Sequence, residues 1–325
     1  MSRGEFNLID AYFSKLGSTR RDVVLGVGDD CAIVQPLANS ELMVATDTMV
    51  AGVHFDENTP ARALGHKIAA VNLSDLAAMG AEPAWLSLAI TLPEMDTDWL
   101  HEFAAGLHEI CSYYGCALIG GDTTRGPLSL TVTAQGQAPA GVGIRRSGAK
   151  AGDWVYVSGA LGDAGLALAA SQNKVTLAAH HQQRVQERLH FPTPQVALGI
   201  GLRGIASAAI DVSDGLLADL GHILKASKVG ARLELNEMPL SLALIETLEY
   251  EQALHYALSS GDDYELCFTV PDERRGMLET ALAHTAVKPV CIGRLTSQTE
   301  QIQLLLDGEP WQAPAQSGFD HFKAD

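Results

Sequence analysis

The chain has 325 residues, of which 47% are hydrophobic and 19% charged, a composition typical of a globular protein with room for two ordinary domains. Its net charge of -17, from 22 basic and 39 acidic side chains, argues against nucleic acid or an anionic membrane as partner, because both require a basic face. No apolar run reaches the roughly 18–20 residues that a membrane span needs.

The start of the chain and its cysteines indicate the compartment. Residues 1–6 include no apolar segment typical of a signal peptide. The five cysteines form no Cys-x-x-Cys pair and are typical of reduced, small hydrophobic side chains. We therefore expect a cytoplasmic protein without membrane attachment.

Hydrophobic patterns in the first half predict alternating strands and helices. A long apolar helix is predicted over 61–79, where Gly80 supplies a left-handed cap. A second helix is predicted over 96–114, with Asp96 or Thr97 as its N-cap. Strands are predicted at 22–27, 41–46, 85–92, 117–119 and 128–135.

Residues 136–152 are rich in Gly, Ala and Pro and indicate a domain boundary. We predict an N-terminal domain over 1–137, a linker over 138–152 and a C-terminal domain over 153–325. Both halves mix helices and strands, so the predicted class is α/β of the α+β type, with two mixed domains. Strands are predicted at 153–158, 208–210, 264–270, 288–293 and 301–306, and helices after 163 and at 174–189, 194–206, 216–227 and 272–284.

Several predicted strands end in small residues followed by aspartate, and these acids often come in pairs. Ligands gather at strand ends in open α/β sheets. A single aspartate there is usually a turn or N-cap residue. Paired carboxylates about 4 Å apart, however, repel by about 4 kcal/mol near a protein surface, so converging pairs require a cation. The endings are 28–30, 45–47, 121–122, 211–214 and 261–263.

Asn72 and Asp75 of the apolar helix over 61–79 are three residues apart and so lie on one face. Backbone groups could satisfy such a pair, but the acids elsewhere favour a shared metal site. The chain has no His-x-x-x-His pattern, and all-oxygen ligands suit Mg²⁺. With Arg146 after a Gly-rich hinge, the pattern suggests a metal–nucleotide site for phosphoryl transfer.

Two glycine-rich segments are candidates for phosphate binding. Residues 199–204 match Gly-x-Gly-x-x-Gly, but they follow the start of a predicted helix instead of a strand, which argues against a dinucleotide site. Residues 159–162 lie between a predicted strand and a predicted helix. A phosphate loop and a plain tight turn explain them equally well.

Seven segments, in order along nearly the whole chain, resemble the thiamine-monophosphate kinase family of the aminoimidazole ribonucleotide synthetase superfamily. The resemblance implies an N-terminal sheet that forms a homodimer interface and a C-terminal domain that closes the active-site cleft. It also implies several Mg²⁺ ions, ATP as co-substrate, and transfer of the γ-phosphoryl group to thiamine monophosphate, giving thiamine diphosphate in the last step of cofactor biosynthesis. The segments are 26–30, 46–48, 71–80, 120–124, 146–148, 211–215 and 261–266.

Matching positions imply roles for single residues. The catalytic residues implied are Asp47, Asp75, Asp122 and Arg146. The metal ligands implied are Asp30, Thr46, Asp47, Asp75, Asp122, Asp211 and Asp214. The ATP contacts implied are Gly121, Asp122, Arg146 and Ser213, and the thiamine contacts are His54, Asp262 and Phe319. An acid and an aromatic ring would attract the cationic thiazolium.

The chain departs from the family pattern at two of these positions. Asp262 stands where Glu is more usual, and Phe319 stands where Tyr or Trp is more usual. Ala45 also replaces a hydroxyl residue found in some relatives. These departures bear on substrate contacts and leave the implied reaction unchanged.

Other functions are compatible with parts of the pattern. A selenide water dikinase would carry a reactive Cys in an N-terminal Gly-rich segment, a setting that Cys31 lacks, and a hydrogenase maturation protein would end in cysteine. The purine-pathway enzyme matches 259–266 and 319–322 less well. A non-catalytic ATP/Mg²⁺ sensor is the alternative from a different class.

Overall fold

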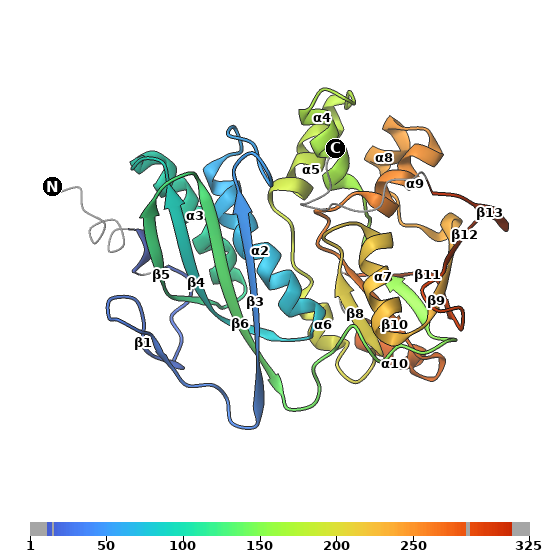
Figure 1. Cartoon of the computed structure of the whole chain (residues 1–325), viewed down its shortest axis with the longest axis horizontal. Coiled ribbons are helices and arrows are strands. Elements are labelled where there is room, and N and C mark those ends of the chain that lie inside the picture. The colour runs from blue at the N-terminus through green and yellow to red at the C-terminus, as the bar shows by residue number, and fades with distance from the viewer. Residues whose placement is uncertain (1–11, 15, 284–286, 314–325) are drawn as a thin grey trace. The chain divides into compact units, whose positions relative to one another are not determined.

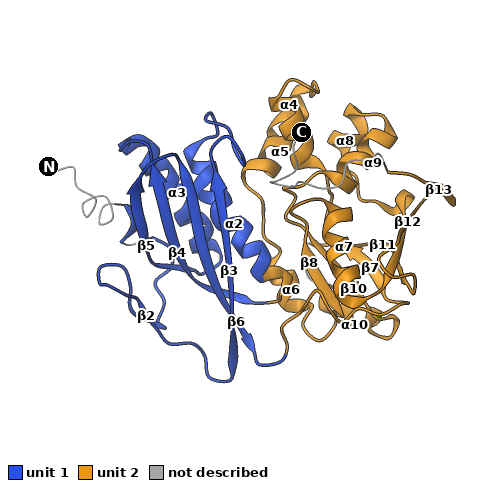
Figure 2. Ribbon diagram, in the orientation of Figure 1, with its two compact units in different colours: residues 1–76, 81–141 blue, residues 77–80, 142–325 orange. Residues whose placement is uncertain are grey.

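The computed structural model divides into two compact units (Figure 2). Unit 1 contains residues 1–76 and 81–141, and unit 2 contains residues 77–80 and 142–325. The sequence does not predict that residues 77–80 group with unit 2. Among the helices of the described ranges, none has the length and hydropathy of a membrane span. The structure describes residues 12–14, 16–283 and 287–313.

Unit 1 is built on a four-stranded mixed sheet with helices on one face (Figure 1). The strand order is β3-β6-β4-β5, so β3 and β5 form the two edges. Helices α2 (Ala61–Ala78) and α3 (Thr97–Tyr113) cover one face, and Asp96 caps α3 as predicted. The strands are β3 (Ser40–Val50), β4 (Glu82–Leu92), β5 (Ala117–Arg125) and β6 (Ser129–Pro139).

The two faces of this sheet differ in chemistry. The inner face, toward the helices, carries buried apolar residues such as Val132. The outer face carries a ladder of hydroxyl pairs. The Thr46 and Thr133 hydroxyl oxygens lie 2.9 Å apart, as do those of Thr48 and Thr131. Side chains alternate between faces along a strand, so these pairs define which residues point outward.

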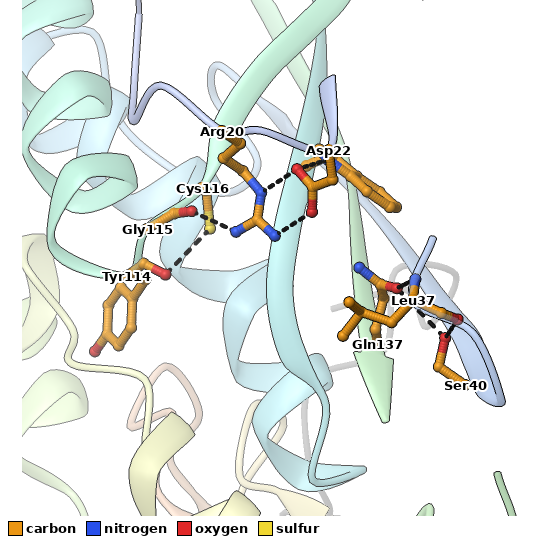
Figure 3. A network of polar contacts seen from close by, with 9 residues as sticks. Arg20, Asp22, Leu37, Ser40, Tyr114, Gly115, Cys116 and Gln137 are labelled. Carbon is orange, nitrogen blue, oxygen red and sulfur yellow. Dashed lines mark hydrogen bonds and ion pairs between the residues drawn. The ribbon is translucent and has the colours of Figure 1, made fainter. Parts of the chain in front are cut away.

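A short two-stranded sheet packs against Trp85 of β4. Arg20, just before it, forms an ion pair of 2.6 Å with Asp22 and donates a hydrogen bond of 2.8 Å to the Gly115 carbonyl (Figure 3). The Trp85 indole donates to Asp22 Oδ1 at 3.3 Å. The Arg20 guanidinium lowers the pKa of Asp22. The two strands are β1 (Val23–Leu25) and β2 (Ile33–Val34).

Unit 2 is organised around a seven-stranded sheet in the order β13-β12-β9-β11-β7-β10-β8. β12 pairs parallel with β9, and the other neighbours are antiparallel. The strands are β7 (Trp154–Val157), β8 (Ala208–Asp211), β9 (Gly230–Glu234), β10 (Leu266–Val270), β11 (Val290–Thr296), β12 (Ile302–Leu306) and β13 (Glu309–Trp311). The helices are α4 (Asp163–Ser171), α5 (Ala179–His190), α6 (Val196–Gly201), α7 (Leu216–Ser227), α8 (Leu242–Thr247), α9 (Tyr250–Ser259) and α10 (Arg275–Ala281).

The mixed α/β class is confirmed, with local differences. The sequence patterns assign no element to β2, β9, β13, α8 or α9. The strands predicted to end at 46 and 119 continue to Val50 in β3 and Arg125 in β5, so the acids expected after them lie within the strands. The helix predicted over 174–189 begins later, at Ala179, and Asn173, just after the preceding helix, adopts a left-handed backbone (φ 58°). The helix predicted over 194–206 is reduced to α6, and Gly204 (φ 72°) prevents its continuation.

Candidate metal and nucleotide site

The first group of candidate residues lies where β3 meets α2. Asn72 is buried, and its Oδ1 accepts a hydrogen bond of 3.1 Å from the Asp47 backbone N–H. Its Nδ2 donates to the Ile68 carbonyl at 3.0 Å. Asp75 is on the same face of α2 as Asn72, so the helix brings it toward Asp47. Asn72 is therefore the positioning residue of this group, a role that the sequence did not assign to it.

Two further candidates in unit 1 lie in loops. Asp30 is exposed, and its backbone N–H donates to Asp29 Oδ1 at 2.8 Å in the turn between β1 and β2. His54 follows β3, and its Nδ1 accepts a hydrogen bond of 3.0 Å from the Val50 backbone N–H. Local contacts thus shape both loops.

Gly121 and Asp122 lie in β5, at the opposite edge of the sheet from Asp47. Three strand spacings, about 14 Å, separate the two edge strands. The Thr124 hydroxyl lies 3.1 Å from the Thr91 hydroxyl on the outer face of the sheet. Asp122 is two residues before Thr124 in the same strand, so its side chain also points to the outer face. Asp47, between two outward-pointing threonines, faces inward. Within one copy of unit 1, Asp47 and Asp122 therefore do not meet, contrary to the convergence expected from the sequence.

In unit 2, the loop after β8 packs against the loop before β10. A Cβ atom at Gly261 would lie 2.2 Å from the Ser213 carbonyl oxygen, so only glycine fits there. The Asp262 backbone N–H donates to the same carbonyl at 2.9 Å. Asp262 is in the left-handed region (φ 67°), and the Tyr264 hydroxyl donates to its Oδ1 at 2.9 Å. These contacts bring Ser213 and Asp262 together.

Asp219, on the first turn of α7, holds the loop after β8. Its Oδ2 accepts hydrogen bonds of 3.0 Å from the backbone N–H groups of both Ser213 and Asp214. Burial, reinforced by the nearby Asp211 and Asp214 carboxylates, raises the pKa of Asp219 to about 7. The sequence patterns assign no role to Asp219. Its signal is an acid in the first turn of a helix, close in sequence to the backbone N–H groups of the loop that leads into this helix.

Arg146 lies in the segment that runs beside β8. The Arg145 carbonyl accepts a hydrogen bond of 3.1 Å from Ala209 in this strand, which ends at Asp211. The Arg146 carbonyl accepts from the Ser227 hydroxyl at 3.0 Å. The Arg146 side chain is exposed and available to an anion.

Neither glycine-rich segment has the features of a phosphate loop. In 159–162, the Gly162 N–H already donates to Asp263 Oδ2 at 2.8 Å, so this donor is occupied within the protein. The structure thus favours the tight turn. Gly199 lies inside α6, where a Cβ would come within 1.9 Å of the Ala77 carbonyl oxygen. This glycine serves close packing, consistent with the predicted helix.

Comparisons with known proteins agree with this arrangement. Residues 28–138 match the N-terminal domain of AIR synthase related protein, and residues 150–304 match its C-terminal domain. The chain is 49% identical to thiamine-monophosphate kinase of Escherichia coli (strain K12) over 327 residues, covering 99% of each chain. The chain belongs to the thiamine-monophosphate kinase family.

Solved structures of thiamine-monophosphate kinases share the fold. The enzyme from Stenotrophomonas maltophilia K279a has a TM-score of 0.83 and 47% identity, covering 89% of this chain and 92% of that one. AaThiL, complexed with AMPPCP and TMP, has a TM-score of 0.76 and 28% identity, covering 98% and 97%. The predicted family and fold class are thus confirmed.

Some residues that carry the thiamine-monophosphate kinase resemblance lie outside the described part of the chain. These include Phe319, for which a thiamine contact is predicted. At Asp262, the shorter acid is held by Tyr264, so its position is defined even though the family more often has Glu.

Proposed function

We propose that this chain transfers the γ-phosphoryl group of ATP to thiamine monophosphate, giving thiamine diphosphate and ADP in the last step of cofactor biosynthesis. The supporting observation is that AaThiL, similar over 98% of this chain, binds AMPPCP and TMP. The full-length likeness to the Escherichia coli kinase supports the same reaction. We place the enzyme in the cytoplasm.

The residues around Asp47 fit a Mg²⁺ requirement. The hydrogen bond of Asn72 links α2 to β3. The carboxylates of Asp47 and Asp75 provide oxygen ligands, which Mg²⁺ prefers. Bound Mg²⁺ would neutralise charge on the transferring phosphoryl group. The Thr46 hydroxyl is bonded on the outer face, so we assign its carbonyl oxygen as the ligand. The other proposed ligands are Asp30, Asp122, Asp211 and Asp214.

The chain's own residues then have mainly positioning roles. The acceptor is a phosphate oxygen, anionic at pH 7, so no strong general base is needed. We assign ATP contacts to Gly121, Asp122, Arg146 and Ser213. We assign thiamine contacts to His54, Asp262 and Phe319. The Tyr264 hydroxyl holds the Asp262 carboxylate, which would attract the thiazolium cation.

We further propose that the working enzyme is a homodimer in which Asp122 serves the metal site of the partner. The strand of Asp122 lies about 14 Å from the strand of Asp47 in the sheet, and the two side chains point to opposite faces. Because β3 and β5 are the two edge strands, an isologous pairing that sets β5 of one copy beside β3 of the other would bring Asp122 to the sheet edge that carries Asp47. The exposed Leu42 and Val44 side chains on β3, at 49% and 60%, support an interface there.

Direct product analysis tests the reaction. The purified chain would be incubated with ATP, Mg²⁺ and thiamine monophosphate, with free thiamine and the purine precursor as parallel substrates. Thiamine diphosphate plus ADP from the monophosphate alone is the expected result. ATP binding without any phosphorylated product would instead support the non-catalytic sensor.

A further inference from the structure

A second group of metal-binding side chains lies in unit 2, on helices α5 and α8. Nε2 of His181 is 2.8 Å from Glu246 Oε2, and Nε2 of His180 is 3.4 Å from the same oxygen. The ligand atoms of the three residues all lie within 4.8 Å of one another. We propose that His180, His181 and Glu246 bind a divalent transition-metal ion such as Zn²⁺.

The His180–Glu246 distance matches that between two ligands of one zinc ion, and the His181–Glu246 distance is close to it. With bonds of about 2.0–2.2 Å and tetrahedral angles, ligand atoms lie about 3.4 Å apart. The His180–Glu246 separation already has this value, and the His181–Glu246 separation is 0.6 Å shorter. The Glu246 side chain is 52% exposed, so its carboxylate can move by this amount without repacking.

The arrangement suits a shared cation better than hydrogen bonding alone. One histidine N–H is enough for a hydrogen bond to a carboxylate oxygen, but here two rings direct Nε2 at the same atom. The ring centroids are 4.0 Å apart, so two protonated rings would repel each other. Two neutral rings, each with its proton on Nδ1, present two nitrogen lone pairs beside the carboxylate.

The ligand types select the metal. Two imidazoles and one carboxylate suit Zn²⁺ and its neighbours Co²⁺ and Ni²⁺, whereas Mg²⁺ prefers oxygen ligands throughout. His180 is 67% exposed, so water can reach a fourth position, while His181 is 9% exposed and fixed in the surface. This site therefore differs in metal preference from the Mg²⁺ site proposed in unit 1.

An ion here would connect two helices that are distant in sequence. α5 and α8 both contribute to an apolar cluster, through Val185 and Leu244 among others. α8 has only six residues and cannot be stable as an isolated helix. Further along α5, Arg188 forms an ion pair of 2.7 Å with Glu265 next to β10. A bound ion would thus stabilise the packing of α5 and α8 without taking part in phosphoryl transfer.

Zinc titration of the full chain tests the site. Isothermal calorimetry with Zn²⁺, in excess Mg²⁺, would compare the wild type with Glu246→Gln and His180→Gln, which change exposed side chains, and with His181→Ala. His101→Gln, an exposed histidine of unit 1, is the control. We expect one Zn²⁺ equivalent in the wild type and the control, and an affinity at least about 10–100-fold weaker in the three variants.

Thermal unfolding and spectroscopy complete the test. Zn²⁺ should raise the melting temperature of the wild type but not of Glu246→Gln, and Co²⁺ should give visible absorption bands that Glu246→Gln lacks. Equal Zn²⁺ affinity and stoichiometry in all variants, or no saturable binding in the wild type, would overturn the proposal and leave a Glu–His hydrogen-bonding cluster.

Discussion

Both units place aspartates at candidate ligand positions, but they differ in how the loops beside these acids are held. In unit 1, Asp30 and Asp122 are exposed and Asp47 and Asp75 partly so, as expected for groups that meet a soluble cation. In unit 2, aspartates next to the corresponding loops are buried and accept backbone N–H groups, as Asp219 does. Aspartates in this chain therefore have two tasks: presenting charge to a ligand, and holding the loop that presents it.

The largest expected effect is on the rate of phosphoryl transfer, when the acids that we assign to Mg²⁺ in unit 1 are replaced. Asp47→Asn or Asp75→Asn should lower kcat by at least about 10²-fold, because a charge that stabilises the transferring phosphoryl group is lost. The melting temperature should change little. Steady-state ADP release and circular dichroism measure the two quantities. Glu94→Gln, an exposed acid elsewhere in unit 1, is the matched control, and a near-native rate in either aspartate variant would contradict the metal-site assignment.

The shared site can be tested with mixed dimers. A dimer of one Asp47→Asn chain and one Asp122→Asn chain, purified through two different tags, should recover about half of the wild-type rate, because one of its two sites is then intact. Each variant alone should be inactive. In the control, Asp47→Asn paired with Asp75→Asn should stay inactive, since both residues serve the site of their own chain. An inactive Asp47/Asp122 heterodimer would show that no site is shared in this way.

The next effect concerns the acid that holds a loop in unit 2. Asp219→Ala leaves two backbone N–H groups without their acceptor, at a cost of about 1–3 kcal/mol. Urea unfolding should show this loss, whereas Asp219→Asn should lose less, because its amide oxygen can still accept. If Asp219→Ala unfolds at the wild-type urea concentration, the loop does not depend on this side chain.

The sequence predicts the elements and their chemistry better than their arrangement. The cap at Asp96 and the helix end at Gly80 follow from local patterns, whereas Asp47 and Asp122 lie within β3 and β5 and not after them as predicted. The separation of Asp47 from Asp122 does not, because it depends on the strand order β3-β6-β4-β5 and on which face each side chain takes. Local patterns also missed Asp219, whose function appears only when the loop folds back onto α7.

The helix pair in unit 2 illustrates the same limit. His180 and Glu246 are 66 residues apart in sequence, and α8 is too short to give a clear helical pattern. Their proximity follows from packing on a common apolar cluster. Sequence reasoning finds ligand sets when spacing is regular within one helix, and misses them when tertiary packing supplies the spacing.

Asp22 is a useful exception to the comparison, because it is an acid of unit 1 with a purely structural role. Arg20 lowers its pKa, so the folded protein binds this proton less tightly than the unfolded chain, where the carboxyl titrates near about 3.9. Ionised Asp22 thus adds stability above that pH, and the contribution is lost as the pH falls through the lowered folded pKa. Asp22→Asn should therefore destabilise the protein by less than about 1 kcal/mol at pH 7, with the difference disappearing in acid. Melting temperatures of both proteins between pH 7 and about pH 2 measure this, with Glu94→Gln as control. A difference that grows toward acid pH would mean that Asp22 is stabilised in its protonated form, and the Arg20 ion pair would then not be what fastens this edge of the sheet.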